Sequence, residues 1–198
     1  QLLPDQQTLD DHADLCPAFA RWRAGHGVIT HTPDTQAAAY RLARQLLQDG
    51  MQPNLESVYN KLIALDHLTS AGMWLVVHMT YAKRCRTDGT PLAAEDFKSR
   101  PEGHTGGALN MVPAYAAYLA LNSLTGTTRS WLMGQGHCVA AIDAINVLTG
   151  NLHPEQADRY AGDTGLNQLL RDFYGYAQMP DSRPAAPLAS HVNAHTAG

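Results

Sequence analysis

The segment 130–148 limits the possible fold of this chain more than any other part of the sequence. It starts with the short apolar run 130–133, passes through the turn Gly134-Gln135-Gly136, and continues with apolar residues at helical spacing up to Leu148. A short apolar run, a glycine turn and a helix in this order are typical of α/β proteins. We therefore predict an α/β fold with a parallel sheet and flanking helices.

Helical periodicity predicts several further helices along the chain. Apolar residues recur at intervals of three and four over 34–50, 54–63 and 69–83, and the glycine-rich turn 103–107 is expected to open another helix. Shorter helices are expected near 154–160 and 164–173. Residues 1–33 are polar and contain several prolines, so we predict an N-terminal arm there and one domain over residues 34–198.

The composition excludes several classes of partner. Hydrophobic residues make up 44% of the chain and charged residues 16%, with a net charge of −4 and no basic run, so neither nucleic acid nor a membrane surface is expected as a partner. The longest apolar stretches are too short to span a bilayer. The cysteines, which are widely spaced, fit neither a disulfide framework nor a zinc pattern, and we expect them to be buried in a cytoplasmic protein: Cys16, Cys85 and Cys138.

Three loops place a histidine in a setting that suits a ligand. His104 lies within Gly103–Gly107, His137 follows the Gly134-Gln135-Gly136 turn, and His191 lies in a proline-rich stretch. Glycines let backbone N–H groups approach an anion, and a helix N-terminus adds a partial positive charge. An imidazole there can donate to a phosphate or move a proton. Each loop alone is better explained by a surface histidine, but together they predict an anion site.

A metal site has less support from the sequence. His191 and His195 have helical spacing, but nearby prolines indicate a loop and no cysteine lies near them. His67 and His78 lie about 16 Å apart on one predicted helix, too far for one ion. We therefore predict no metal ligands, and the remaining histidines are expected to be exposed or hydrogen-bonded locally: His12, His26, His31, His67, His78 and His153. The aromatic residues near the loops are expected to pack in the core: Tyr115, Tyr118 and Trp131.

The three loops, in their order, resemble the thiamin-diphosphate enzymes of the transketolase family. Similar features there are a Gly-His turn before a helix, a strand that runs into a Gly-His pair, and a third histidine loop. The phosphoketolase branch is the more similar, through the run 92–100 before the first loop, the Gly134-Gln135-Gly136-His137 turn, and the segment 163–173. The resemblance covers about residues 90–198.

This resemblance implies a lyase that binds thiamin diphosphate and Mg²⁺. The enzyme would cleave xylulose 5-phosphate or fructose 6-phosphate with phosphate, giving acetyl phosphate and an aldose phosphate. It would make His104, His137 and His191 catalytic, as groups that move protons on the sugar hydroxyls. His104 and His191 would face the sugar, and Gly134, Gly136 and His137 would lie beside the diphosphate and the reacting centre. It also implies a homodimer or larger homo-oligomer. Two alternatives stay open: a transketolase-type two-carbon transferase, and a non-catalytic α/β module that binds a phosphorylated ligand.

The sequence departs from the family in several places. Thr105, Gln135 and Cys138 differ from the residues usual in phosphoketolases at these positions. The family's metal-binding Gly-Asp-Gly run does not occur, and in the family's order it would follow the third loop. We therefore expect this chain to be an amino-terminal piece of the pyrophosphate-binding domain that is inactive by itself.

Overall fold

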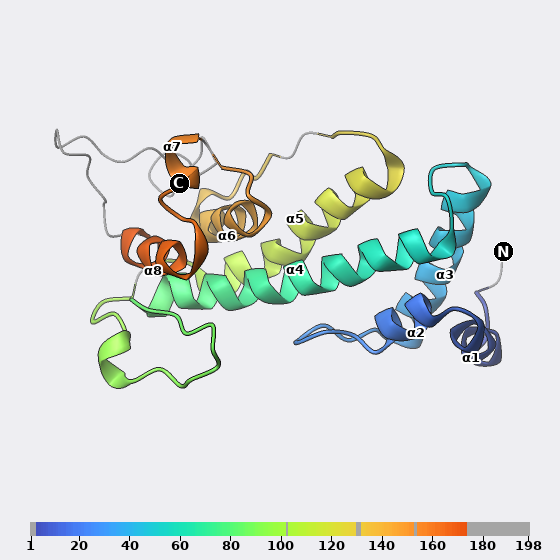
Figure 1. The fold of residues 1–198 in the computed structure, drawn as a ribbon, viewed down its shortest axis with the longest axis horizontal. Helices are drawn as coiled ribbons and strands as arrows, with labels where there is room; N and C mark the ends of the chain where they lie inside the picture. The colour runs from blue at the N-terminus through green and yellow to red at the C-terminus, as the bar shows by residue number, and fades with distance from the viewer. Residues whose placement is uncertain (1–2, 102, 130–131, 153, 174–198) are drawn as a thin grey trace. The chain divides into compact units, whose positions relative to one another are not determined.

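The structure is a computed structural model that describes residues 3–101, 103–129, 132–152 and 154–173 (Figure 1). This described part is all-helical, so the predicted α/β fold with a parallel sheet is wrong. Its β pairing is limited to two isolated bridges, His26 with Ile29 and Ala82 with Phe97. The helices are α1 (Gln6–Leu15), α2 (Pro17–Arg23), α3 (Pro33–Gln48), α4 (Leu55–Tyr81), α5 (Thr105–Thr125), α6 (Val139–Thr149), α7 (Pro154–Ala157) and α8 (Gly162–Asp172), with 3₁₀ turns at Ala94–Asp96 and Gly136–Cys138.

The run 130–133 shows why the prediction of a sheet failed. Residues 130–131 lie outside the described part; of the other two, Leu132 is 87% exposed and Met133 is buried, and neither is in a strand. A strand needs a neighbour that accepts its backbone hydrogen bonds, and a short apolar run carries no information about one. The turn after the run and the helix α6 follow the prediction, but the strand before them does not.

Contacts divide the chain into two compact units, and each is discontinuous in sequence. The first unit comprises Gln1–Ser70 and Ala116–Trp131, and the second comprises Ala71–Tyr115 and Leu132–Gly198. Helices α4 and α5 each contribute residues to both units. The predicted boundary at residue 33 is not tested by this division and stays a prediction.

Residues 6–23, which we expected to belong to an irregular arm, form two helices of the first unit. Asp5 caps α1 by accepting a hydrogen bond from the Thr8 N–H at 2.9 Å, and Pro17 stands at the first position of α2. Proline is well tolerated there because that N–H has no helical partner. The two helices bury Leu9, Phe19 and Trp22 in a core completed by α3, α4 and Leu124.

Helix α4 is continuous where the sequence predicted two helices. Asp66, which lies between the two predicted helices, is 5% exposed. Its Oδ2 atom is 2.8 Å from the Nε2 atom of His31, and the His31 ring stacks on Trp22. By length and composition α4 could cross a membrane, a test that the core helix of a soluble protein also passes. Near the start of α4, the Lys61 Nζ atom donates to the Ser123 carbonyl oxygen at the end of α5. The Gln52 side chain, just before α4, donates to the carbonyl oxygen of Leu124.

In the second unit, α4, α5 and α6 approach one another closely at Gly72. A Cβ atom built on Gly72 would lie 2.8 Å from the Ile145 Cδ1 atom and 2.9 Å from the Val112 Cγ1 atom. Helix α6 is buried from Val139 to Asn146, and the Tyr115 hydroxyl donates to the Asn146 Oδ1 atom at 2.8 Å. Glycine at position 72 therefore lets three helices share one packed core.

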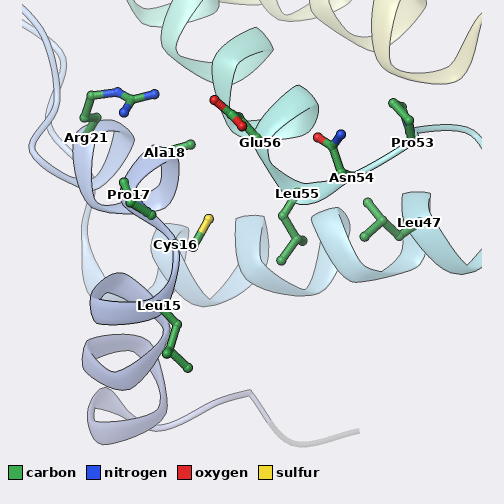
Figure 2. Close-up of a pocket in the computed structure, with 10 residues that line it drawn as sticks. All are labelled: Leu15, Cys16, Pro17, Ala18, Arg21, Leu47, Pro53, Asn54, Leu55 and Glu56. Carbon is green, nitrogen blue, oxygen red and sulfur yellow. The ribbon is translucent and has the colours of Figure 1, made fainter.

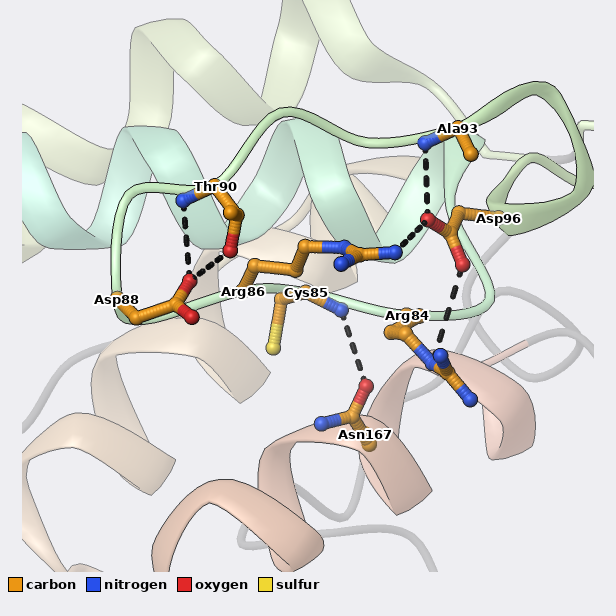
Figure 3. A network of polar contacts seen from close by, with 8 residues as sticks. All are labelled: Arg84, Cys85, Arg86, Asp88, Thr90, Ala93, Asp96 and Asn167. Atoms are coloured by element: carbon orange, nitrogen blue, oxygen red, sulfur yellow. Dashed lines mark hydrogen bonds and ion pairs between the residues drawn. The ribbon is translucent and has the colours of Figure 1, made fainter.

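A polar network fixes the loop between α4 and α5 in the second unit (Figure 3). The buried carboxylate of Asp96 accepts hydrogen bonds from the Ala93 N–H at 2.9 Å and the Arg86 Nη2 atom at 3.0 Å. The Ala93 N–H and then the Arg86 guanidinium lower the pKa of Asp96. The Cys85 N–H donates to the Asn167 Oδ1 atom of α8 at 3.0 Å, so the loop is tied to a second element.

Candidate functional site

The first predicted histidine, His104, caps helix α5. Its carbonyl oxygen accepts the first helical hydrogen bond, from the Ala108 N–H at 3.0 Å. Its Nδ1 atom accepts from the Gly107 N–H at 3.1 Å. Serine, aspartate or asparagine usually takes this role, in which a side chain satisfies a helix N–H that has no backbone partner. The ring of His104 is thus held at the start of the helix although the residue is exposed.

The second predicted histidine, His137, lies against the first. It belongs to the 3₁₀ turn Gly136–Cys138, which leads directly into α6. The ring centroids of His104 and His137 are 4.5 Å apart, with an angle of 69° between the ring planes. Both residues are exposed. Two histidine loops that are distant in the sequence therefore meet at the starts of two helices, without the sheet that we expected to bring them together.

Gly107 lies close to both the His104 ring and the Cys138 thiol. A Cβ atom on Gly107 would lie 2.6 Å from the His104 Nδ1 atom and 2.8 Å from the Cys138 Sγ atom, so these atoms fill the space that any side chain would need. Cys138 is 2% exposed, and burial raises the pKa of its thiol. The thiol is therefore a packing group here rather than a nucleophile.

The two glycines of the predicted turn differ in exposure. Gly134 is exposed with open space where a Cβ would stand, whereas Gly136 is buried. No described side chain caps either the 3₁₀ turn or α6. The Cys138 and Val139 N–H groups donate to carbonyl oxygens of the 3₁₀ turn and the first residues of α6 are buried, so the exposed polar groups here include the two imidazoles and the backbone at Gly134. Among the described residues, no group of three His, Cys, Asp or Glu side chains could hold a metal ion.

The third predicted site residue, His191, lies outside the described residues, as do Trp131 and His153. Several other histidines have close partners, and some of these partners are distant in the sequence. The Nε2 atom of His12 lies 3.1 Å from the Tyr59 hydroxyl, and the Nδ1 atom of His78 lies 2.8 Å from the Trp74 carbonyl oxygen. His26 stacks on His67 with ring centroids 3.7 Å apart.

Asp143 is an unusual group that sequence reasoning missed. It is 8% exposed within α6, and its Oδ1 atom has no hydrogen-bond partner in the part of the chain that the structure describes. Burial raises the pKa of this carboxyl group to about 8, so it holds a proton at neutral pH. The signal in the sequence was one acidic residue inside the apolar run Val139–Leu148.

A pocket of about 620 Å³ lies in the first unit, apart from the residues predicted from the sequence (Figure 2). The corner between α1 and α2 forms one side of it, and the connection from α3 to α4 forms the other. Most of its lining is apolar, with Arg21 and Glu56 as the charged side chains; the other lining residues are Leu15, Cys16, Pro17, Ala18, Leu47, Pro53, Asn54 and Leu55.

The histidine pair is therefore the arrangement that sequence and structure identify together. It combines two exposed imidazoles, an uncapped helix start and an open glycine turn. Compared with known protein families, curated proteins and solved structures, the chain matches none of them.

Proposed function

We propose that His104 and His137 belong to the substrate site of a thiamin-diphosphate-dependent phosphoketolase. The observation that carries this proposal is the ring contact between the two histidines, 4.5 Å between centroids, at the starts of α5 and α6. These are the loops on which the resemblance to phosphoketolases rests. A ketose phosphate and a diphosphate both present oxygens that imidazoles and helix N–H groups can bind.

The residues of this chain would bind and orient rather than supply the reactive carbon. When bound, thiamin diphosphate provides the nucleophilic carbon that breaks a carbon–carbon bond of the sugar. The backbone around Gly134 and Gly136, together with the His137 ring, would face the diphosphate, and the His104 ring would contact the sugar phosphate. The described residues offer no ligand set for a divalent ion. The proposal therefore assigns no step to an ion held by these residues.

A second function has its own support. A helical module that binds a phosphorylated ligand without catalysis needs only the anion site, and it requires neither a sheet nor a metal site. The all-helical character of the described residues favours this alternative. A transketolase-type transferase would use the same histidine pair as a phosphoketolase, so only the products separate these two enzymes.

Calorimetry and a product assay test the proposal together. Thiamin diphosphate with Mg²⁺ is titrated into this chain and into the longest product of its gene. The longer product is also incubated with thiamin diphosphate, Mg²⁺, xylulose 5-phosphate and phosphate. We expect the longer product to bind the cofactor and to form acetyl phosphate. Substitution of His137 by Ala should lower turnover with little change in melting temperature, because an exposed ring contributes little packing.

Each other outcome has a defined meaning. Failure of the longer product to bind thiamin diphosphate would refute the enzyme, and binding of xylulose 5-phosphate alone would then favour the non-catalytic module. Transfer of a two-carbon unit only to an aldose acceptor would identify a transketolase instead. A large fall in melting temperature in the His137→Ala variant would assign that residue a structural role.

A further inference from the structure

We infer that Gly107 fixes the His104 ring in one tautomer, so that His104 serves its ligand as a hydrogen-bond donor and not as a base. This role of His104 rests on the function proposed above, because it requires that a ligand binds at the histidine pair. It names Gly107 as a positioning residue. It also defines the atom that His104 contacts: an acceptor oxygen, such as that of a phosphoryl, carboxylate or carbonyl group.

The tautomer follows from the hydrogen bond at the start of α5. The Gly107 N–H donates to the His104 Nδ1 atom at 3.1 Å, so this nitrogen must offer a lone pair. A neutral imidazole carries its one proton on the other nitrogen, here Nε2. Nε2–H is then the polar group of the ring that remains for a ligand. A doubly protonated ring would lose the bond to Gly107, and a base would need the lone pair that this bond already uses.

The position of the ring depends on the missing side chain at residue 107. A Cβ atom there would come within 2.6 Å of the Nδ1 atom, and it would also meet the Cys138 Sγ atom at 2.8 Å. The preceding glycine differs, since a Cβ atom on Gly106 would meet nothing within 4 Å. Two adjacent glycines in the first turn of one helix therefore have different roles, and Gly106 provides a matched control for Gly107.

Three variants separate the capping role of His104 from its donor role. His104→Asn keeps a side-chain oxygen that can accept from the Gly107 N–H, because asparagine is a good helix cap, but it has no Nε2–H. Gly107→Ala should displace the ring, and Gly106→Ala should leave it in place. The readouts are the ring nitrogen signals of His104 by NMR, the melting temperature, and binding of xylulose 5-phosphate as the probe.

We expect the Nε2–H tautomer in the unsubstituted protein and in Gly106→Ala, and its loss in Gly107→Ala. Xylulose 5-phosphate binding should weaken about tenfold in His104→Asn, with the melting temperature nearly unchanged, because one hydrogen bond to a charged oxygen is lost. Gly107→Ala should weaken binding to a similar extent, and Gly106→Ala should bind as the unsubstituted protein does.

An Nδ1–H tautomer in the unsubstituted protein would overturn the inference. So would equal tautomer signals in the two glycine variants, or xylulose 5-phosphate binding by His104→Asn that is as tight as that of the unsubstituted protein. If Gly107→Ala does not fold, the tautomer of the unsubstituted protein and the His104→Asn variant still decide. The NMR readout needs no thiamin diphosphate, so failure of the proposed enzyme to bind that cofactor is a separate result.

Discussion

The carboxyl group of Asp143 shows how burial can change the charge of a single residue. It lies within the buried helix α6, and its pKa is raised to about 8 by burial. In the unfolded chain an aspartate has a pKa of about 3.9. Between these two values the folded protein holds a proton that the unfolded chain has lost, so stability falls as the pH rises through this window.

Substitution of Asp143 by Asn should remove this pH dependence. Asn has a similar shape and stays neutral, so the variant should gain stability over the unsubstituted protein, and the gain should grow from pH 4 to pH 8. At pH 7 we expect a gain on the order of 2–4 kcal/mol, from about 1.4 kcal/mol per pH unit. Urea unfolding at several pH values measures it. A gain that is the same at pH 4 and pH 7 would contradict the raised pKa.

Residues of the candidate site and its surroundings differ in how readily they could be identified from the sequence. His104 and His137 could be selected because glycines and apolar helical runs surround them. Gly107 could not be distinguished from Gly106, because the atoms above it, Nδ1 of His104 and Sγ of Cys138, are brought there by folding. Asp143 was visible as one acid in an apolar run, but its burial depends on what packs around α6.

Among the elements, α4, α5 and α6 depend on glycine where they meet. Gly72→Ala should destabilise the protein by about 1–3 kcal/mol, because its Cβ would overlap Val112 and Ile145, both 0% exposed. Gly106→Ala is the control: it lies in α5 with open space, so the higher helix propensity of alanine should stabilise by about 0.5–1 kcal/mol. Thermal unfolding compares them. Equal effects would show that the crossing at Gly72 is loosely packed.

Helices were predictable from this sequence where period and capping agree. The pattern over 34–50 corresponds to α3, which Thr32 caps by accepting a hydrogen bond from the Thr35 N–H. Two elements failed for opposite reasons. The gap between the predicted helices 54–63 and 69–83 contains Asp66, whose carboxylate is paired inside the core with His31, a residue distant in the sequence. The run 130–133 had the composition of a strand, but nothing in a short run specifies a partner strand.

For the whole molecule, the core of the first unit is self-contained. Its cluster of buried hydrophobic residues runs from Leu9 to Leu62 and includes Leu124, all within the first unit. A loss of packing there should therefore act mainly on that unit. Local and subglobal opening of this kind is visible in amide hydrogen exchange.

Phe19→Ala tests this independence. Phe19 is 0% exposed, so its truncation should cost about 3–5 kcal/mol. We expect amide protection to fall in α1, α2 and α3 while α6 and α8 keep theirs. Phe97→Ala, at a side chain that is 47% exposed, is the control and should change little. Hydrogen exchange measured by mass spectrometry gives both results. An equal loss of protection in α6 and α8 would mean that the two units unfold as one.

The interleaving of the two units also has a consequence for biosynthesis. The first unit is completed only by Ala116–Trp131, so the chain from Ala71 to Tyr115 must leave the ribosome before the first unit can close. In a nascent chain that ends before residue 116, the apolar side chains that form a core with Leu124 are still exposed. The side chains of Gln52 and Lys61 also lack the carbonyl oxygens of Leu124 and Ser123, to which they later donate. Proteins whose units follow one another in sequence can fold them in turn during translation. In this chain, residues 1–70 cannot complete their unit until residues 116–131 have been synthesised.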